Sequence, residues 1–443
     1  FSPCGGKIPL PSNFAIGSPY YKPKRNLSMR LCRILLDWRF ALILLIAFLI
    51  ILRAPYLFIN ARFWAEEGAV YFSFAYHHYF LESLFSAHQG YYSFFPNLIT
   101  LIAASIVPLE KAPLFTTISA MLIQLVPYIF VLYRLPNSPV IIWLPLLKIV
   151  LCAIIFFVVN TGEIWLNTIT TQFHLAIASF FVLFSEQSGV LSRRFLIDWV
   201  IIFLGGVTGV ITCFLLPAFV VKWILERQKS ILVSIIVLSF SCLLQMVYIF
   251  LQPNALGNRF SVDQFISKWP VVLRTWMDQF VLWPIFGDKH SFSHEVIIGA
   301  LSASIIIFFV LTAIKANRSE LTPPIIAFFS VATLSLLGSL EMGGGYRYAY
   351  VPGVMLVSIL TFSITCKAGI RNTILSFLIL LSLSNWVPSW KPSLSPWVVE
   401  EGPIWSEEVE MWRMNPAMPL KIFPQWGPYD GDWSVTLKSV TQS

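Results

Sequence analysis

The feature that most constrains this chain is a series of long apolar segments whose ends carry most of the Lys and Arg residues. A helix needs about 20 predominantly apolar residues to cross the hydrocarbon core of a bilayer. Candidate segments cover residues 40–59, 113–133, 139–160, 172–185, 196–221, 231–251, 293–314, 323–340, 349–365 and 372–388. The sequence therefore predicts an all-α polytopic membrane protein with roughly 10–12 transmembrane helices.

The composition excludes several other classes of protein. Hydrophobic residues occupy 57% of the 443 positions and charged residues only 12%, which is far more apolar than a soluble core of this size needs. The net charge of +8 comes from Lys and Arg beside apolar segments, where they orient helices and contact lipid headgroups, so we expect no nucleic-acid partner. The six cysteines show neither metal-ligand spacing nor a disulfide framework.

Basic residues set the expected orientation, because Lys and Arg concentrate in cytoplasmic loops. The stretch through Arg30, Arg33 and Arg39 predicts a basic cytoplasmic segment over residues 1–39. Within it, Met29 is a candidate for the physiological start of the protein. We expect a multi-pass protein of a bacterial inner membrane, with its functional face towards the periplasm or exterior.

Two placements reconcile the later charges with this orientation. The shorter apolar run 94–108 is placed in or near the outer interface, within a long first outer loop over residues 60–112. The segment 196–221 is interpreted as a hairpin broken at its glycine-rich GGVTG, which membrane depth tolerates where the break faces protein or water. The basic residues that then lie inside are Arg134, Arg193, Arg194, Lys222, Arg227, Lys229, Lys315, Arg318, Lys367 and Arg371.

This topology divides the chain into the basic segment 1–39, a transmembrane domain over 40–388 and an outer tail over 389–443. The tail is rich in Trp and Pro and has no spanning segment. Because aromatic residues favour the membrane interface, we expect a small extramembrane cap there. The polar motifs of the chain gather on the same outer face, as is expected of a binding or catalytic site.

The first of these motifs is a pair of adjacent glutamates, Glu66 and Glu67, in FWAEEGAVYF. Two neighbouring carboxylates near a low-dielectric surface repel each other, so the pKa of one should rise, which suits a general base or a proton carrier. The alternative is structural: acids also favour the N-terminus of a helix, here one that runs along the interface.

A basic start, one span and an acidic pair in a long first outer loop resemble the GT-C superfamily of integral-membrane glycosyltransferases. The resemblance implies a GT-C-like helical bundle and a sugar donor linked to a polyprenyl phosphate. It implies that an acid of the first outer loop is the catalytic base or contacts a metal. Alignment with the superfamily's Asp-Glu form makes Glu66 the base and Glu67 its neighbour, although both residues are Glu in this chain.

A second motif, TGEIWLNTITTQFH, carries Glu163, Asn167, Gln172 and His174. The spacing of four residues predicts that Glu163 and Asn167 share one face of a helix. Two interpretations remain open. The stripe is either a hydrogen-bond network that locks helices together or a substrate-binding surface for a sugar or phosphate, with Trp165 available for stacking.

A donor linked to phosphate needs cations at the outer interface, and Arg is the natural bidentate partner. Arg347 in GGGYRYAY and Arg259 in QPNALGNRF are the candidates, and each could instead reach lipid headgroups. Tyr348, next to Arg347, is a further candidate substrate-binding residue. No cofactor is required for this chemistry. A divalent cation is possible near His77, His78 and His88, but their spacing is not that of a recognised metal site.

The leading functional hypothesis is transfer of a sugar from a polyprenyl-phosphate donor to the hydroxyl of a glycan or other acceptor, with inversion of configuration. The expected partners are this donor, the acceptor and membrane lipids. The first alternative is a transporter or flippase for a lipid-linked sugar, in which the glutamates couple transport to protons. The second is a non-catalytic assembly subunit, which leaves the clustering of polar residues unexplained.

Overall fold

The computed structural model describes residues 37–135, 144–159, 161–185, 192–252, 262–267, 269–287, 299–307, 311, 320–339, 346–364, 369–390, 402–423 and 433–437. The chain divides into two units, Phe1–Leu42 and Ile43–Ser443. In the first unit, Arg39 pairs with Asp37 at the beginning of helix α2 (Trp38–Arg53). The remaining elements belong to the second unit.

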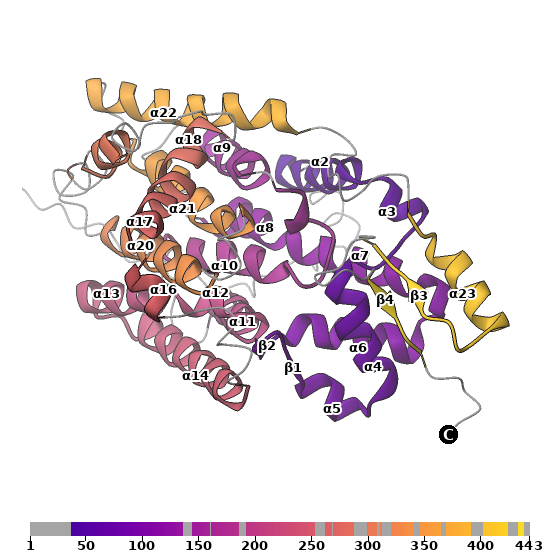
Figure 1. The fold of residues 1–443 in the computed structure, drawn as a ribbon. Coiled ribbons are helices and arrows are strands. Elements are labelled where there is room, and N and C mark those ends of the chain that lie inside the picture. Colours follow the sequence, from indigo (N-terminus) through magenta and orange to yellow (C-terminus); the bar gives the residue numbers. More distant parts are fainter. Residues whose placement is uncertain are drawn as a thin grey trace, which may run out of the picture. The chain divides into compact units, whose positions relative to one another are not determined.

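Helices account for nearly all of the regular structure, as Figure 1 shows, and this confirms the predicted all-α class. The early helices are α3 (Tyr56–Ile59), α4 (Ser73–His77), α5 (Phe80–Phe85), α6 (Phe94–Ile106), α7 (Ala112–Gln124), α8 (Val126–Arg134), α9 (Leu144–Phe157) and α10 (Thr171–Val182). The later ones are α11 (Arg193–Thr208), α12 (Val210–Cys213), α13 (Leu216–Glu226), α14 (Lys229–Leu251), α16 (Val262–Ser267), α17 (Trp269–Met277), α18 (Trp283–Phe286), α20 (Thr322–Leu337), α21 (Tyr350–Phe362), α22 (Ile370–Trp386) and α23 (Trp405–Met414).

Two helical stretches of the described chain, Leu109–Arg134 and Lys229–Leu251, are long and apolar enough to cross a membrane. The first comprises α7 and α8, and the second is α14. Shorter apolar helices include α6, α10 and α20. By length and composition, these helices are consistent with association of the protein with a membrane.

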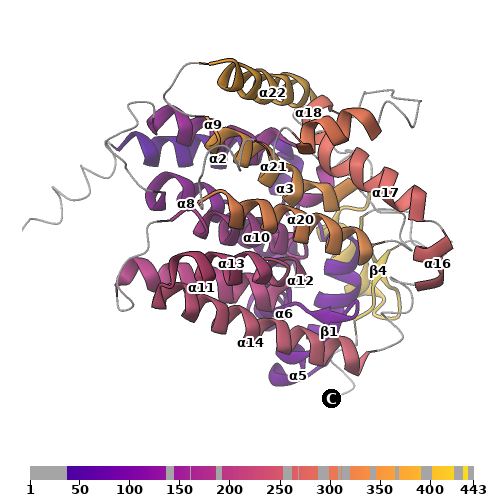
Figure 2. The same cartoon turned by 90° about the vertical axis from the view of Figure 1, so that its left-hand side faces the viewer.

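The segment that contains GGVTG folds back on itself, as predicted. Helix α11 ends before Gly209, and α13 returns to the side from which α11 started (Figure 2). Asp198, near the start of α11, accepts a hydrogen bond from the hydroxyl of Ser185 at 3.5 Å, and Lys222 of α13 donates to the carbonyl of Leu183. A Cβ atom on Gly209 would lie 2.0 Å from Oε1 of Gln172, so glycine allows this close approach.

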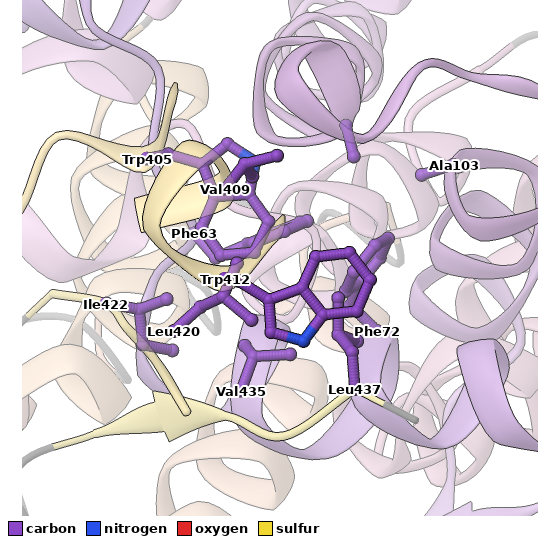
Figure 3. Packing of buried hydrophobic residues seen from close by; sticks show 11 residues of the cluster. Phe63, Phe72, Ala103, Trp405, Val409, Trp412, Leu420, Ile422, Val435 and Leu437 are labelled. Carbon is purple, nitrogen blue, oxygen red and sulfur yellow. The ribbon is translucent and has the colours of Figure 1, made fainter. Parts of the chain in front are cut away.

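Residues of the 60–112 loop region and of the C-terminal tail form one shared hydrophobic core, shown in Figure 3. Its members are Phe63, Phe72, Ala103 and Ala112 from the loop, and Trp405, Val409, Trp412, Leu420, Ile422, Val435 and Leu437 from the tail. Full burial of one large apolar side chain stabilises a fold by about 1.5–3 kcal/mol. The described tail therefore packs its apolar residues on the loop rather than on itself alone.

Polar contacts reinforce this docking of the tail. The indole N–H of Trp405 donates to the carbonyl of Leu109 at 2.7 Å, and Arg413 pairs with Glu110 at 2.5 Å. The loop and the tail each add a short antiparallel hairpin, β1 (Ala87–His88) with β2 (Tyr91–Tyr92), and β3 (Leu420–Lys421) with β4 (Ser434–Val435).

A different set of charged residues, all of them buried, surrounds the carboxyl ends of α8 and α10: Arg134, Lys148, Asp198 and Lys222. Arg134 donates from Nε and Nη2 to the two oxygens of Asp198, at 2.8 and 2.5 Å. Lys148 donates to the carbonyls of Leu132 and Leu135 at 3.0 and 3.1 Å. The last carbonyls of a helix lack intrahelical partners and carry partial negative charge, so the lysines at this end cap helices.

Candidate functional site

The acidic pair lies at the start of the π-helix η1 (Glu67–Phe72), directly after a strained residue that the C-terminal tail holds in place. Ala65 has a φ of +29°, in the left-handed region that costs a non-glycine residue about 1–2 kcal/mol. Its N–H donates to the carbonyl of Phe423 at 2.7 Å, and the N–H of Glu67 donates to the carbonyl of Trp64 at 2.7 Å. Trp64 and Phe423 also form an isolated parallel bridge. A tail residue thus fixes the backbone that presents both glutamates.

Glu67 is the buried member of the pair, with only 1% of its surface exposed. Its Oε1 accepts hydrogen bonds from the backbone N–H of Thr168 at 2.8 Å and from the Thr168 hydroxyl at 2.6 Å. Burial raises the pKa of the Glu67 carboxyl, and the hydrogen bonds from Thr168 partly oppose that rise. This side chain links the 60–112 loop region to the segment that precedes α10.

Glu66, by contrast, is half-buried and lines a cavity of about 700 Å³, a volume that includes the cavity's open mouth. The other polar residues of the lining include Gln89, Tyr91, Thr170, Gln172 and Arg347. Apolar residues come from the region of the α11–α13 break and from α20: Val210, Ile211, Phe214 and Leu334. The cavity therefore suits a ligand with a charged or hydroxylated part and an apolar part.

Arg347 brings a positive charge to the same cavity. It lies in the 3₁₀ turn η6 (Tyr346–Ala349) that leads into α21, and its guanidinium carbon is 5.4 Å from the ring centre of Tyr348. Its Nη1 is 3.4 Å from Oε2 of Glu163, and both side chains are about 30% exposed. The carboxylate of Glu66 also attracts this positive charge. Such a long, solvated contact is worth about 0–1 kcal/mol, so an anionic ligand could displace it.

The helix predicted through Glu163 and Asn167 does not form, and that prediction is wrong. Glu163 lies in a 3₁₀ turn, η3 (Gly162–Ile164), Leu166 has a φ of +60°, and α10 begins only at Thr171. The side chain of Asn167 explains the difference. Its Nδ2 donates to the carbonyl of Glu163 at 2.8 Å while its Oδ1 accepts from the N–H of Thr170 at 3.0 Å. Such local bonds compete with helix formation.

The residues of this second motif nevertheless separate into two groups. Asn167 and Gln172 line the cavity, and Nε2 of Gln172 donates to the hydroxyl of Tyr91 at 3.0 Å. Asn167 and Glu163 also line a smaller cavity of about 370 Å³. His174 is fully buried instead, with its ring centre 5.0 Å from that of Trp165. The structure therefore places His174 in the packing of the core.

The remaining sequence candidates have the following positions. Tyr348 lines the cavity beside Arg347, and Arg259 lies outside the described residues. Local partners of the loop histidines are the carbonyl of Ser73 for His77, the carbonyl of Phe74 for His78, and the hydroxyl of Ser86 for His88. Among the residues that the structure describes, no three His, Cys, Asp or Glu side chains gather closely enough to hold a metal ion.

Two cavity residues that sequence reasoning missed, Gln89 and Tyr91, come from the β1–β2 hairpin. Gln89 and Gly90 form its turn with φ of +56° and +84°. The amide of Gln245, in α14, accepts from the N–H of Tyr92 and donates to its carbonyl, both at 3.0 Å, and so fixes the hairpin. A two-residue turn that ends in Gly, between residues that favour strands, is a hairpin signal, and the Gln-Gly pair in AHQGYY is one.

Comparison of the chain with protein-family models, with curated proteins and with solved structures gave no match.

Proposed function

We propose that the protein is a membrane glycosyltransferase that transfers a sugar from a polyprenyl-phosphate donor to an acceptor hydroxyl. The observation that carries the proposal is one cavity that combines the carboxylate of Glu66, the guanidinium of Arg347 and an apolar wall at Phe214. An amphipathic donor matches these three properties. The proposal includes a multi-pass placement in a bacterial inner membrane, with the cavity on the periplasmic or exterior side.

In the proposed reaction, the acceptor oxygen attacks the anomeric carbon while the carboxylate of Glu66 takes the proton of the acceptor hydroxyl. The bond between the anomeric carbon and the phosphate oxygen breaks, and its electron pair goes to the lipid phosphate. Arg347 stabilises the negative charge that develops there, so the leaving group needs no separate acid. A single displacement inverts the anomeric configuration.

The two glutamates have different roles in this proposal. Glu66 is the base, because it faces the cavity where an acceptor can approach. Glu67 is a positioning residue, because its Oε1 accepts hydrogen bonds from Thr168 and its side chain is sealed from solvent. This assignment agrees with the order that the superfamily resemblance implies.

The test compares Glu66→Gln with Glu67→Gln in lipid vesicles, using synthetic polyprenyl-phosphate donors that carry different sugars. We expect Glu66→Gln to lower the transfer rate by about 100-fold or more, the usual contribution of a general base. Glu67→Gln keeps an acceptor oxygen for Thr168 and should retain most of the activity. Full activity in both variants would remove the base assignment.

A transporter remains the alternative outcome of the same experiment. Movement of the donor across the vesicle membrane without sugar transfer would favour it. The charged residues near the carboxyl ends of α8 and α10, such as Arg134 and Asp198, form a separate group. Among the described residues, none of them lines the cavity. A cavity confined to one end of the helices supports a one-sided enzyme site over a transport path.

A further inference from the structure

The short helix α5 exposes a continuous apolar surface. Tyr79, which precedes the helix, is 87% exposed, Leu81 is 66% exposed, and Phe80 and Phe85 are each more than half exposed. The buried residue of this helix is Ser83, whose hydroxyl donates to the carbonyl of His78 at 3.4 Å. Single apolar side chains are common on protein surfaces, but a cluster of this kind marks a site of interaction.

Hydrogen bonds fix α5 at the carboxyl end of the membrane-length helix α14. The hydroxyl of Tyr248 donates to the carbonyl of Phe85 at 2.8 Å, and Nε2 of Gln252 donates to the carbonyl of Ala87 at 2.9 Å. The last turns of α14 carry exposed apolar residues of their own: Leu243, Met246, Val247, Phe250 and Leu251. The apolar surface of α5 therefore lies next to that of a helix long enough to span a bilayer.

Three stacked aromatic rings mark the junction between α14 and α5. The ring centres of Tyr248 and Tyr92 are 4.8 Å apart, and those of Tyr92 and Phe85 are 6.5 Å apart. Aromatic side chains concentrate at the boundary between hydrocarbon and water, where their apolar rings and polar groups are both satisfied. If α14 spans the bilayer, this position at its end puts α5 at the level of a lipid boundary.

We propose that α5 lies on the outer surface of the bilayer, with Tyr79, Phe80, Leu81 and Phe85 inserted between the headgroups and the acyl chains. The inference rests on the proposed membrane placement but not on sugar transfer. Residues 78–92 contain the acid Glu82 and no Lys or Arg, so the attachment depends on apolar burial and not on attraction to anionic lipids.

The attachment has a consequence for the cavity. The β1–β2 hairpin follows α5 directly and contributes Gln89 and Tyr91 to the lining. If α5 sets the depth of this hairpin, the polar wall of the cavity lies close to the headgroup level. That is the depth at which the phosphate of a lipid-linked ligand sits.

The test measures the environment of single nitroxide labels on the full-length protein in zwitterionic nanodiscs, after replacement of the six native cysteines by alanine. Labels replace Leu81, its charged neighbour Glu82 about 100° further around α5, and Leu243 of α14 as the lipid reference. All three positions are exposed, so the labels need not disturb packing. The readout is the ratio of accessibility to oxygen, which partitions into lipid, and to a water-soluble nickel chelate.

We expect the oxygen-to-nickel accessibility ratio at position 81 to match the ratio at position 243 and to exceed the ratio at position 82 several-fold. Addition of anionic lipid should leave these ratios unchanged. Equal ratios at 81 and 82, or shielding of 81 from both reagents, would overturn the inference while leaving the membrane placement intact. Nickel accessibility at 243 would overturn the membrane placement itself, and the inference with it.

Discussion

One Arg–carboxylate pair lies beside the cavity, through Arg347, and another lies at the opposite end of the helices, but the two pairs have different environments. Arg134 and Asp198 are buried and joined by two short hydrogen bonds, at 2.8 and 2.5 Å. Arg347 and Glu163 are about 30% exposed and 3.4 Å apart. The first pair is nearly closed to water, whereas the second remains open to solvent and to a ligand. Similar residues therefore serve stability at one end and, in the proposed function, ligand binding at the other.

Breaking the buried pair should have the largest effect on stability. Asp198→Ala leaves Arg134 as an uncompensated buried charge, so we expect the free energy of unfolding to fall by about 3 kcal/mol or more. Denaturation in detergent micelles measures this loss. The double variant Arg134→Met/Asp198→Leu should recover most of it, because well-packed apolar residues replace a buried ion pair at little cost. A single variant as stable as the wild type would show that the pair is not structural.

Arg347→Gln should have the opposite profile. Its exposed pair contributes about 0–1 kcal/mol, so the free energy of unfolding should barely change. We expect the affinity for polyprenyl phosphate to fall by about 10-fold to 100-fold, since a hydrogen bond between charged groups is worth about 1.5–3 kcal/mol. Calorimetric titration with polyprenyl phosphate measures the affinity. Arg413→Gln, which breaks an exposed pair away from the cavity, is the matched control and should leave the affinity unchanged.

Glu67→Gln should have the smallest effect on stability, and the size of that effect should depend on pH. Burial raises the pKa of Glu67 in the folded protein, so the folded state keeps its proton to a higher pH than the unfolded state. The stability that this gives is present below the unfolded pKa of about 4.5 and is lost as pH rises through the raised pKa. The Tm of Glu67→Gln should therefore exceed that of the wild type slightly at pH 7.5 and converge with it as the pH falls below about 4.5. A constant Tm difference would contradict the burial of an ionisable group.

Part of this arrangement could be predicted because it depends on local composition. Long apolar runs predict helices, and flanking cations together with the glycines of GGVTG predict the hairpin reversal near Gly209. The adjacency of Glu66 and Glu67 also predicts that one pKa rises. The main cause of the rise at Glu67 is burial rather than repulsion between the two carboxylates, and only the fold shows which glutamate is buried.

The rest could not be predicted because it depends on partners that are distant in sequence. The left-handed conformation of Ala65 is stabilised by the carbonyl of Phe423, which no local pattern near the glutamates reveals. Spacing alone suggested a helix through Asn167, where side-chain bonds to the backbone stabilise an irregular segment instead. His174 belongs to the same motif, yet its burial beside Trp165 follows from tertiary packing.

The most direct test of the central claim is an electron cryo-microscopy structure of the protein in nanodiscs saturated with polyprenyl phosphate. The account predicts phosphate density beside Arg347, with the prenyl chain along the apolar wall at Val210 and Phe214, and loss of that density in Arg347→Gln. Phosphate density at the opposite end of the helices, near Arg134 and Lys222, or an unchanged position in Arg347→Gln, would contradict the account.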